Sequence, residues 1–351
     1  MKYHSSGETL PAPISHRSVA DTWEAIRGYT TPISIGIHSY LPDGRPLYAA
    51  YATEFESGSF KERGALEKML LLGSAGVDRA VLYSAGNHLT GCSLAARETG
   101  IHIDGIVPGY TPQLKMDRAL ELGNGNVTVR QLSGGLDEAR DAAYAMATQL
   151  GAPVIEPYDD EDVARGQGTL MHELLLRMPE IDHVVVPEGG GGLRAGVATA
   201  VRELGLTTKV HGAKLSAEYE LCEGAYVHQL GQVALQTSRE NSRLWGTTLR
   251  VTSVDVGAMV ALEDAARLEH AEAMGSAALE GYPEGTALLG AAAVHAYYEQ
   301  FEGTVAVIVT GSNADQKKLD TLHDRYKSSL QVSTSAGFHT ASGHQFRRQA
   351  A

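Results

Sequence analysis

Short apolar runs rich in β-branched residues alternate with helical stretches along most of this 351-residue chain. Strands are predicted at 77–85, 103–109 and 127–132, and helical patterns follow them at 91–100, 114–123 and 136–151. Two further runs that favour strands, 183–189 and 304–311, each end in glycine. Strands separated regularly by helices predict parallel sheets and an α/β fold. Ligands bind at the carboxyl ends of the strands in such sheets, so we expect the chemistry in the segments that follow strands.

The composition narrows the class of protein. The formal net charge is −13, which argues against nucleic acid as a partner and against an anionic membrane surface, because both need a basic face. No run of about 18 apolar residues is present, so we expect no membrane span. The N-terminus has no apolar region typical of a signal peptide. Cys92 and Cys222 do not have the spacing of a zinc site, and two cysteines in so long a chain favour the reducing cytosol. We therefore expect a cytoplasmic protein.

Two motifs offer side chains for chemistry. In SGSFKERGA (57–65), Lys61 follows Phe60. A lysine that condenses with an aldehyde must be neutral, and burial beside an apolar ring would lower its pKa from the usual value of about 10.4. SAGNHLTG (84–91) directly follows a predicted strand. Backbone N–H groups there can point at a ligand, and Asn87 offers both an amide donor and a carbonyl acceptor.

Two further motifs follow the other predicted strands. VPEGGGGLRAG (186–196) has four successive glycines before a helical stretch, which lets the backbone close around a phosphate at a helix N-terminus. It is neither a P-loop nor a dinucleotide-binding fingerprint, because the spacing differs and no GK[ST] follows. VIVTGSNAD (307–315) places the hydroxyl of Thr310 at the end of the last predicted strand.

In this order, the four motifs resemble the fold-type II pyridoxal-phosphate (PLP) enzymes and are most similar to the threonine/serine dehydratases. That family has an SFKxRGA lysine, an SAGNHxxG loop, a VPxGGGGLxxG phosphate loop and a late SGxN. Supporting matches are Thr31–Pro32, a TPxxK at 111–115, PYDDEDV at 157–163 and GQGT at 166–169. The resemblance runs from about residue 30 to residue 315, which is most of the chain.

The resemblance implies a role for each matching residue. Lys61 would carry PLP as a Schiff base and move the Cα proton. Phe60 would pack near the cofactor ring, Asn87 would bind the ring hydroxyl, and Thr310 would face the pyridine nitrogen. The phosphate would be held by Gly189, Gly190, Gly191, Gly192 and Leu193. The substrate would be bound by Ser84, Ala85, Gly86, Asn87, His88 and Glu284, and Ser84 is a second candidate acid/base.

Departures from the family pattern fall on the substrate side. Lys214 and Leu215 stand where the family has the Glu and Pro of its G-[VA]-E-P segment. Relatives that bind a divalent cation have carboxylate ligands in this region, and we therefore expect no metal here, although Glu218 and Glu220 are near. NSRLWGTT (241–248) stands near the place of the family's ADG, and the PEG that contains Glu284 is closer to threonine synthases. Tyr83 precedes the SAGNH loop where small residues are usual.

A lyase is the function that the resemblance implies. A threonine at the pyridine nitrogen brings no negative charge to hold a proton there, which leaves the ring a weaker electron sink and suits β-elimination. The expected reaction is the dehydration and deamination of L-threonine, L-serine or a β-substituted relative to a 2-oxo acid and ammonia. The alternatives are a threonine synthase-like β/γ-replacement enzyme, a racemase in which Ser84 is the second acid/base, and a non-catalytic PLP-binding protein.

Two parallel-sheet α/β domains, with PLP in the cleft between them, form the expected architecture. The larger domain is predicted to comprise 1–44 and 156–330, the smaller 45–155, and residues 331–351 to be a mobile tail. Members of the family are homodimers or homotetramers, and we expect the same of this chain. Its small-molecule partner would be an amino-acid substrate.

Overall fold

The computed structural model describes residues 17–217, 222, 227, 229–260, 262–263 and 283–313, and within them two β-sheets. The larger has the strand order β1-β2-β10-β7-β8-β9 and the smaller the order β5-β4-β3-β6. The strands of the larger sheet are β1 (Ser34–Tyr40), β2 (Pro46–Tyr51), β7 (His183–Pro187), β8 (Lys209–Leu215), β9 (Trp245–Val251) and β10 (Val305–Val309). Those of the smaller are β3 (Arg79–Tyr83), β4 (His102–Val107), β5 (Val127–Gln131) and β6 (Val154–Ile155).

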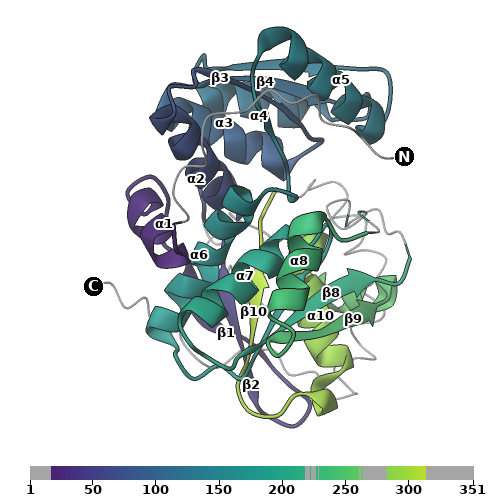
Figure 1. Ribbon diagram of the computed structural model, residues 1–351. Coiled ribbons are helices and arrows are strands. Elements are labelled where there is room, and N and C mark those ends of the chain that lie inside the picture. Colours follow the sequence, from purple (N-terminus) through teal and green to yellow (C-terminus); the bar gives the residue numbers. More distant parts are fainter. Residues whose placement is uncertain are drawn as a thin grey trace, which may run out of the picture.

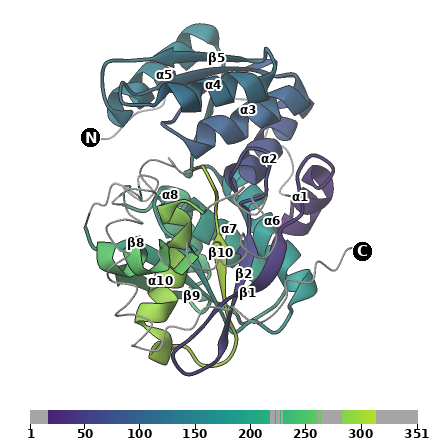
Figure 2. The same cartoon turned by 180° about the vertical axis from the view of Figure 1, so that it is seen from behind.

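The helices cover these sheets and connect their strands (Figures 1 and 2). They are α1 (Val19–Ile26), α2 (Lys61–Ser74), α3 (Asn87–Thr99), α4 (Gln113–Gly123), α5 (Leu136–Leu150), α6 (Glu161–Arg177), α7 (Gly192–Glu203), α8 (Gln232–Glu240) and α10 (Leu289–Ala296), with the 3-10 turns η3 (Gly285–Leu288) and η4 (Tyr298–Gln300). Figure 1 shows the smaller sheet, with α3, α4 and α5, above the larger one. The expected architecture of two α/β domains is confirmed.

Both faces of the central strands of the large sheet are buried, which explains their uninterrupted apolar runs. On β10, Val305, Val307 and Val309 pack in the cluster that contains α10. Ala306 and Ile308, which point the other way, pack against α6 and α7. Full burial of a valine or isoleucine side chain contributes about 1.5–3 kcal/mol, so these strands anchor the sheet on which the glycine-rich segments sit.

The five predicted strands and the three predicted helices are all present, with ends that differ by a few residues. One strand pair departs from the expected parallel arrangement. β1 pairs antiparallel with β2, and β2 then pairs parallel with β10. β2 falls within 45–155, the range predicted for the smaller domain, yet it belongs to the larger sheet because a hairpin keeps its two strands adjacent. We therefore propose that the smaller domain begins after β2. The predicted tail at 331–351 lies outside the described residues.

Glycines bring α2, α6 and α7 into direct backbone contact. A Cβ on Gly166 would lie 2.5 Å from the carbonyl oxygen of Arg63 and 2.6 Å from the Cα of Gly64. One on Gly168 would lie 2.5 Å from the carbonyl oxygen of Gly196. The GQGT segment at 166–169 is therefore the part of α6 that both neighbouring helices cross. Its glycines set how closely α2, which begins at Lys61, approaches the larger domain.

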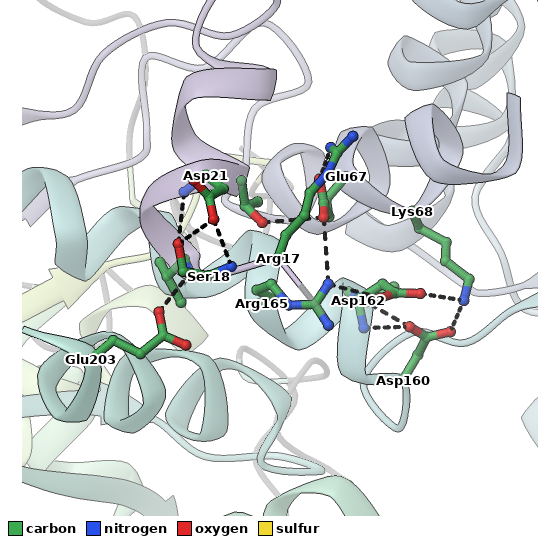
Figure 3. A network of polar contacts seen from close by, with 12 residues as sticks. Arg17, Ser18, Asp21, Glu67, Lys68, Asp160, Asp162, Arg165 and Glu203 are labelled. Atoms are coloured by element: carbon green, nitrogen blue, oxygen red, sulfur yellow. Dashed lines mark hydrogen bonds and ion pairs between the residues drawn. The ribbon is translucent and has the colours of Figure 1, made fainter. Parts of the chain in front are cut away.

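A network of charged side chains also fastens α2 (Figure 3). The fully buried carboxylate of Glu67 accepts a hydrogen bond from Thr22 Oγ1 at 3.1 Å and forms ion pairs with Arg17 at 3.5 Å and Arg165 at 3.4 Å. The next residue, Lys68, pairs with Asp160 at 2.7 Å and Asp162 at 3.0 Å. These contacts join α2 to α6 and to the segment that begins α1. The lysine-bearing helix is thus fixed between the two sheets (Figures 1 and 2).

We expect Gly168→Ala to destabilise the fold by about 1–3 kcal/mol, because its Cβ would overlap the backbone of α7. Gly73→Ala is the matched control on α2, since its Cβ would meet only Ile101 Cδ1 at 3.6 Å. Alanine is the better helix former by up to about 1 kcal/mol, so the control should be neutral or stabilising. Chemical denaturation midpoints measure both changes. Equal midpoints for the two variants would contradict the role assigned to the α6–α7 contact.

Candidate active site

The carboxyl end of β10 holds the segment that carries Lys61. The backbone N–H of Phe60 donates to the carbonyl oxygen of Thr310 at 2.8 Å, and Ser59 forms an isolated bridge with Gly311. Thr310 is buried directly after β10. Phe60, Lys61 and Thr310, all predicted from the sequence as cofactor residues, therefore lie next to one another. β10 is also the parallel neighbour of β7 in the sheet, so the glycine segment after β7 lies at the same carboxyl-terminal end of the strands.

Lys61 is the first residue of α2, and it is half-buried with its amine desolvated. Nζ donates to the carbonyl oxygen of Pro157 at 2.5 Å and lies 5.1 Å from the centre of the Phe60 ring. Burial lowers the pKa of Lys61 from 10.5 to about 8, against the opposing effects of Cys92 and Glu284. A lysine with this pKa has a substantial neutral fraction near neutral pH, as condensation with an aldehyde requires.

Two charged residues directly after Lys61 fix the first turn of α2. Glu62 accepts hydrogen bonds from Thr30 Oγ1 and, at 3.0 Å, from the backbone N–H of Ser57. Arg63, fully buried, donates to the carbonyl oxygen of Thr31 and to Glu173 Oε2, both at 2.9 Å. The Arg63 guanidinium also lies 4.6 Å and 4.7 Å from two ring centres, those of Trp23 and Phe55. Neither residue is assigned a role from the sequence alone, although the SFKERGA motif contains both.

The side chain of Asn87 is held at both ends. Its Nδ2 donates to Glu284 Oε1 at 2.7 Å, and its Oδ1 accepts a hydrogen bond from Asn313 Nδ2 at 2.8 Å. Asn313 also donates to the carbonyl oxygen of Ser57 at 2.9 Å. A second N–H of Asn87 Nδ2 remains for a further acceptor, because an amide nitrogen carries two hydrogens. Asn313, which has no assigned role in the VIVTGSNAD motif, thus connects the SAGNH loop to the lysine segment.

The SAGNH loop lies at the carboxyl end of β3, and α3 begins at its asparagine. The Ser84 hydroxyl oxygen accepts a hydrogen bond from the backbone N–H of Gly86 at 3.1 Å, which leaves the hydroxyl proton for another partner. His88 is buried, and its Nε2 donates to the carbonyl oxygen of Ile155 at 3.0 Å. Burial lowers the pKa of His88 to about 3, so its ring is neutral. The ring is therefore part of the core, and only its backbone remains for the predicted contact with substrate.

The predicted phosphate loop connects β7 to α7. Gly191 adopts a left-handed conformation with φ of 87°, and α7 begins at Gly192. No side chain caps this helix end and no acidic residue lies in its first turn. The first N–H groups of a helix have no intrahelical partner, and they attract anions. The loop therefore offers what a phosphate needs.

A cavity of about 510 Å³ opens beside this loop. It is lined by Asp137 at the start of α5 and by Tyr158, Asp159 and Leu230, so residues of both domains form its wall. Tyr158 also covers the glycines, since a Cβ on Gly190 would overlap its ring. Asp159 accepts a hydrogen bond from the backbone N–H of Val233 at 2.9 Å and so caps α8.

Tyr83 and Lys214, two of the residues that depart from the family pattern, lie in different domains. Tyr83 donates to Glu156 Oε2 at 2.7 Å, and Tyr144 binds the other oxygen of the same carboxylate. Lys214 lies buried on β8, and burial lowers its pKa. Within the described ranges, no group of three or more His, Cys, Asp or Glu side chains is arranged to hold a metal ion. Glu218 and Glu220 lie outside the described residues.

Comparison with known proteins identifies the family. A model of the family described as "Pyridoxal-phosphate dependent enzyme" matches residues 48–311. The L-threonine ammonia-lyase of Thermotoga maritima is 30% identical over 292 residues, which are 80% of this chain and 70% of that protein. The L-threo-3-hydroxyaspartate ammonia-lyase of a Pseudomonas species is 27% identical and aligns with 88% of this chain and 98% of its own length. The chain spans less than half the length of several other threonine dehydratases that it matches.

A solved structure of a threonine deaminase has the same fold. The processed form of threonine deaminase isoform 2 from Solanum lycopersicum superposes with a TM-score of 0.72 at 26% identity, covering 87% of this chain and 86% of that one. The chain belongs to the family of pyridoxal-phosphate dependent enzymes, as the four motifs predicted, and PLP is its cofactor. The described site fits this group: it combines a half-buried lysine of lowered pKa with an uncapped helix N-terminus. No helix in the described ranges is both long and apolar enough to cross a membrane.

We expect covalent capture of PLP by Lys61 to titrate near pH 8. Full-length apoprotein would be mixed with PLP at each pH and treated with borohydride, and the labelled Lys61 peptide quantified by mass spectrometry. In Glu284→Gln the midpoint should move below that of the wild type, because Glu284 raises the pKa of Lys61. A midpoint near 10.5 in the wild type, or an upward shift in the variant, would show that the enclosure of Lys61 does not control its proton.

Proposed function

We propose that this chain is an ammonia-lyase that eliminates water from a hydroxy-amino acid such as L-threonine, L-serine or a β-substituted relative. The products are a 2-oxo acid and ammonia. The observation that carries the proposal is the hydroxyl residue Thr310 at the end of β10, where it adjoins the segment of Lys61. A hydroxyl beside the ring nitrogen keeps the ring a moderate electron sink, which favours loss of a leaving group over transamination. The two ammonia-lyase relatives support the same reaction type.

The residues divide into those that bind the cofactor and those that bind the substrate. Gly189, Gly190, Gly191, Gly192 and Leu193 would hold the phosphate through backbone N–H groups. Phe60 would pack against the ring, the second N–H of Asn87 would donate to the ring hydroxyl, and Thr310 would face the ring nitrogen. The substrate carboxylate would bind to the loop Ser84–His88 at the start of α3. The backbone N–H of Ser84 donates to Ile106 and that of Gly86 to Ser84 Oγ, so the carboxylate would take the N–H groups of Ala85, Asn87 and His88 and the Ser84 hydroxyl.

PLP, when bound, supplies the electron sink that accepts the electron pair left at Cα. Lys61 Nζ then has the task of taking the Cα proton, and its pKa of about 8 allows it to act as a base near neutral pH. Glu284, which accepts a hydrogen bond from Asn87, would bind the substrate hydroxyl. That hydroxyl leaves with a proton as water while the Cα–Cβ double bond forms. The released enamine gains a proton at Cβ, and hydrolysis gives the 2-oxo acid and ammonia.

A replacement enzyme is the second candidate, and the position of Glu284 favours it. The PEG segment that contains Glu284 is closer to threonine synthases than to dehydratases, and Glu284 contacts Asn87. Thr310 also favours this candidate, because dehydratases commonly have serine at that position. Such an enzyme would form the same unsaturated species and add a nucleophile or water to it. A racemase would need Ser84 as a second acid/base, and the hydroxyl proton of Ser84 is available for that role.

The proposed enzyme is a cytoplasmic homodimer or homotetramer. The reducing cytosol suits its two free cysteines, both buried. Exposed apolar side chains such as Leu176 and Leu204 lie near the ends of α6 and α7 and are candidates for a subunit interface. Sedimentation equilibrium of the purified protein would give the mass of the assembly, and a monomer at micromolar concentration would contradict the proposal.

We expect 2-oxo acid and ammonia to appear together from at least one hydroxy-amino acid. The panel comprises L- and D-serine, L- and D-threonine, 3-hydroxyaspartate and O-phosphohomoserine. Lys61→Ala should abolish release and the yellow colour, because Lys61 is the amine that lies beside Phe60 in the segment bound to Thr310. Lys68→Arg, on the same helix, is the matched control and should retain both.

The same reactions also separate the two alternatives. Consumption of an amino acid without release of 2-oxo acid or ammonia would favour the replacement enzyme, because replacement keeps the amino group. Formation of the mirror-image amino acid, detected by chiral chromatography, would favour the racemase. Colour and borohydride bleaching that persist in Lys61→Ala would show that the lysine assignment is wrong.

Removal of divalent cations should leave the rate unchanged, because β8 presents the ammonium of Lys214 where a cation-binding relative has a carboxylate. The measurement is turnover after dialysis against EDTA, with and without added Mg²⁺. A loss of about tenfold or more that Mg²⁺ restores would overturn the expectation of no metal.

A further inference from the structure

Two charged residues flank the predicted phosphate loop, and both are buried. Glu188 stands between Pro187, the last residue of β7, and the first glycine. Arg194 lies in the first turn of α7, two residues after Gly192. The exposed fraction is 2% for Glu188 and 0% for Arg194. In the VPxGGGGLxxG pattern these are positions that the motif leaves open, so the function described so far gives them no task.

The two side chains meet behind the loop and share a third partner. Arg194 Nη1 forms an ion pair with Glu188 Oε2 and donates to Thr248 Oγ1 at 2.9 Å. Thr248 in turn donates to Glu188 Oε1 at 3.1 Å, so both carboxylate oxygens are bound. The pair thereby links the residue before the glycines to the helix after them.

The rest of the guanidinium is directed to β8 and β9. Nη2 donates to the carbonyl oxygens of Gly246 at 2.6 Å and Val210 at 3.1 Å, and Nε donates to Val210 at 3.3 Å. The Arg194 guanidinium carbon lies 4.1 Å from the centre of the Trp245 ring. All five N–H groups of the guanidinium therefore have partners within the protein. An arginine next to a phosphate loop would ordinarily be assigned to the phosphate, but here none of its donors remains for that contact.

Gly212 on β8 leaves room in the large sheet for the side chains of Glu188 and Arg194. A Cβ on Gly212, in the middle of β8, would overlap Glu188 Oε2 and come within 3.0 Å of Arg194 Nη1. The backbone of Glu188 is itself fixed, because its N–H donates to the carbonyl oxygen of Ala213 at 2.8 Å. Both ends of the glycine loop are therefore tied to the same two strands.

We propose that the Glu188–Arg194 pair positions the loop Gly189–Gly192 so that its N–H groups are preset for the cofactor phosphate. The inference rests on the proposed binding of phosphate by this loop. Glycines give a loop many conformations of similar energy, and binding must select one of them. An ion pair that ties both ends of the loop to β8 and β9 removes most of that freedom before the phosphate arrives. The two residues are positioning residues and do not touch the cofactor.

Comparison of PLP with pyridoxal, which has the aldehyde but no phosphate, isolates this role. The dissociation constants of both would be measured by titration of full-length apoprotein, following the yellow colour formed on Lys61. The ratio of the pyridoxal dissociation constant to the PLP dissociation constant reports how much the phosphate contributes to binding. Pyridoxal binding alone reports that the lysine site is folded. The variants are Glu188→Gln, Arg194→Met, the double variant and Arg194→Lys.

Each single substitution should lower the ratio by about 10- to 100-fold, the range typical of residues that hold a binding group in place. The double variant should lower it no further than the more damaging single one, because both residues act through one pair. Arg194→Lys keeps the charge opposite Glu188 but loses contacts to β9, and it should give an intermediate ratio even if Arg194→Met does not fold.

Asp104→Asn is the matched control. Asp104 is a fully buried carboxylate of the small sheet and pairs with Arg79 at 2.7 Å, away from the loop. Its loss should weaken the fold without changing the ratio.

Three results would overturn the proposal. Ratios within twofold of the wild type in the single variants would show that the pair does not act on the loop. A higher ratio in Glu188→Gln would mean that Glu188 acts only as a negative charge near the phosphate. A wild type without preference for PLP over pyridoxal would instead refute phosphate binding by the loop, and with it this inference.

Discussion

Burial of an amine at the start of α2 is the constraint on which the site depends. The Lys61 ammonium lies in an enclosed position that disfavours its charge, so the first turn of the helix has to be held by other contacts. Glu62 and Arg63 provide them through hydrogen bonds to Thr30, Thr31 and Glu173. Neither of these charged residues reaches Nζ. Their effect is to fix the backbone so that the lysine keeps its place beside Thr310 while its proton remains labile.

The sequence predicts much of the fold because the informative patterns are local. Runs such as VAVIV at Val305–Val309 are buried on both faces, and this burial leaves a signature that needs no knowledge of the partners. The β1–β2 hairpin was missed, although LPDGRP contains a turn signal. Gly44 there has φ of 84°, and its N–H donates to Leu41. The pairing of β2 with β10 joins residues about 258 positions apart, as in Leu47 and Val305, and no local pattern predicts it.

The residues predicted to bind the cofactor belong to sequence motifs, whereas the residues that support them in the structure do not stand out in the sequence. Lys61, Asn87 and the glycines belong to motifs whose spacing has meaning in itself. The acceptor of the lysine, Pro157, is a backbone carbonyl, and any residue type could provide one. Asn313 and Arg194 depend on strands brought together by the topology, so their partners emerge only in three dimensions. The roles of the individual site residues stay predictions until they are measured.

The antiparallel β1–β2 hairpin has a consequence for how the chain acquires its cofactor during synthesis. Its second strand, β2, pairs with β10, which is synthesised last among the described strands. Thr310 and Asn313 follow β10 in the sequence and are synthesised later still. Lys61 leaves the ribosome early, but the edge of the sheet against which it is held consists of residues made some 250 positions later. Domains generally fold in the order of their synthesis, and the small sheet at 79–155 can form first. Cofactor capture is then a late event, coupled to closure of the large sheet, and a truncated chain would expose the lysine without a ring-binding surface.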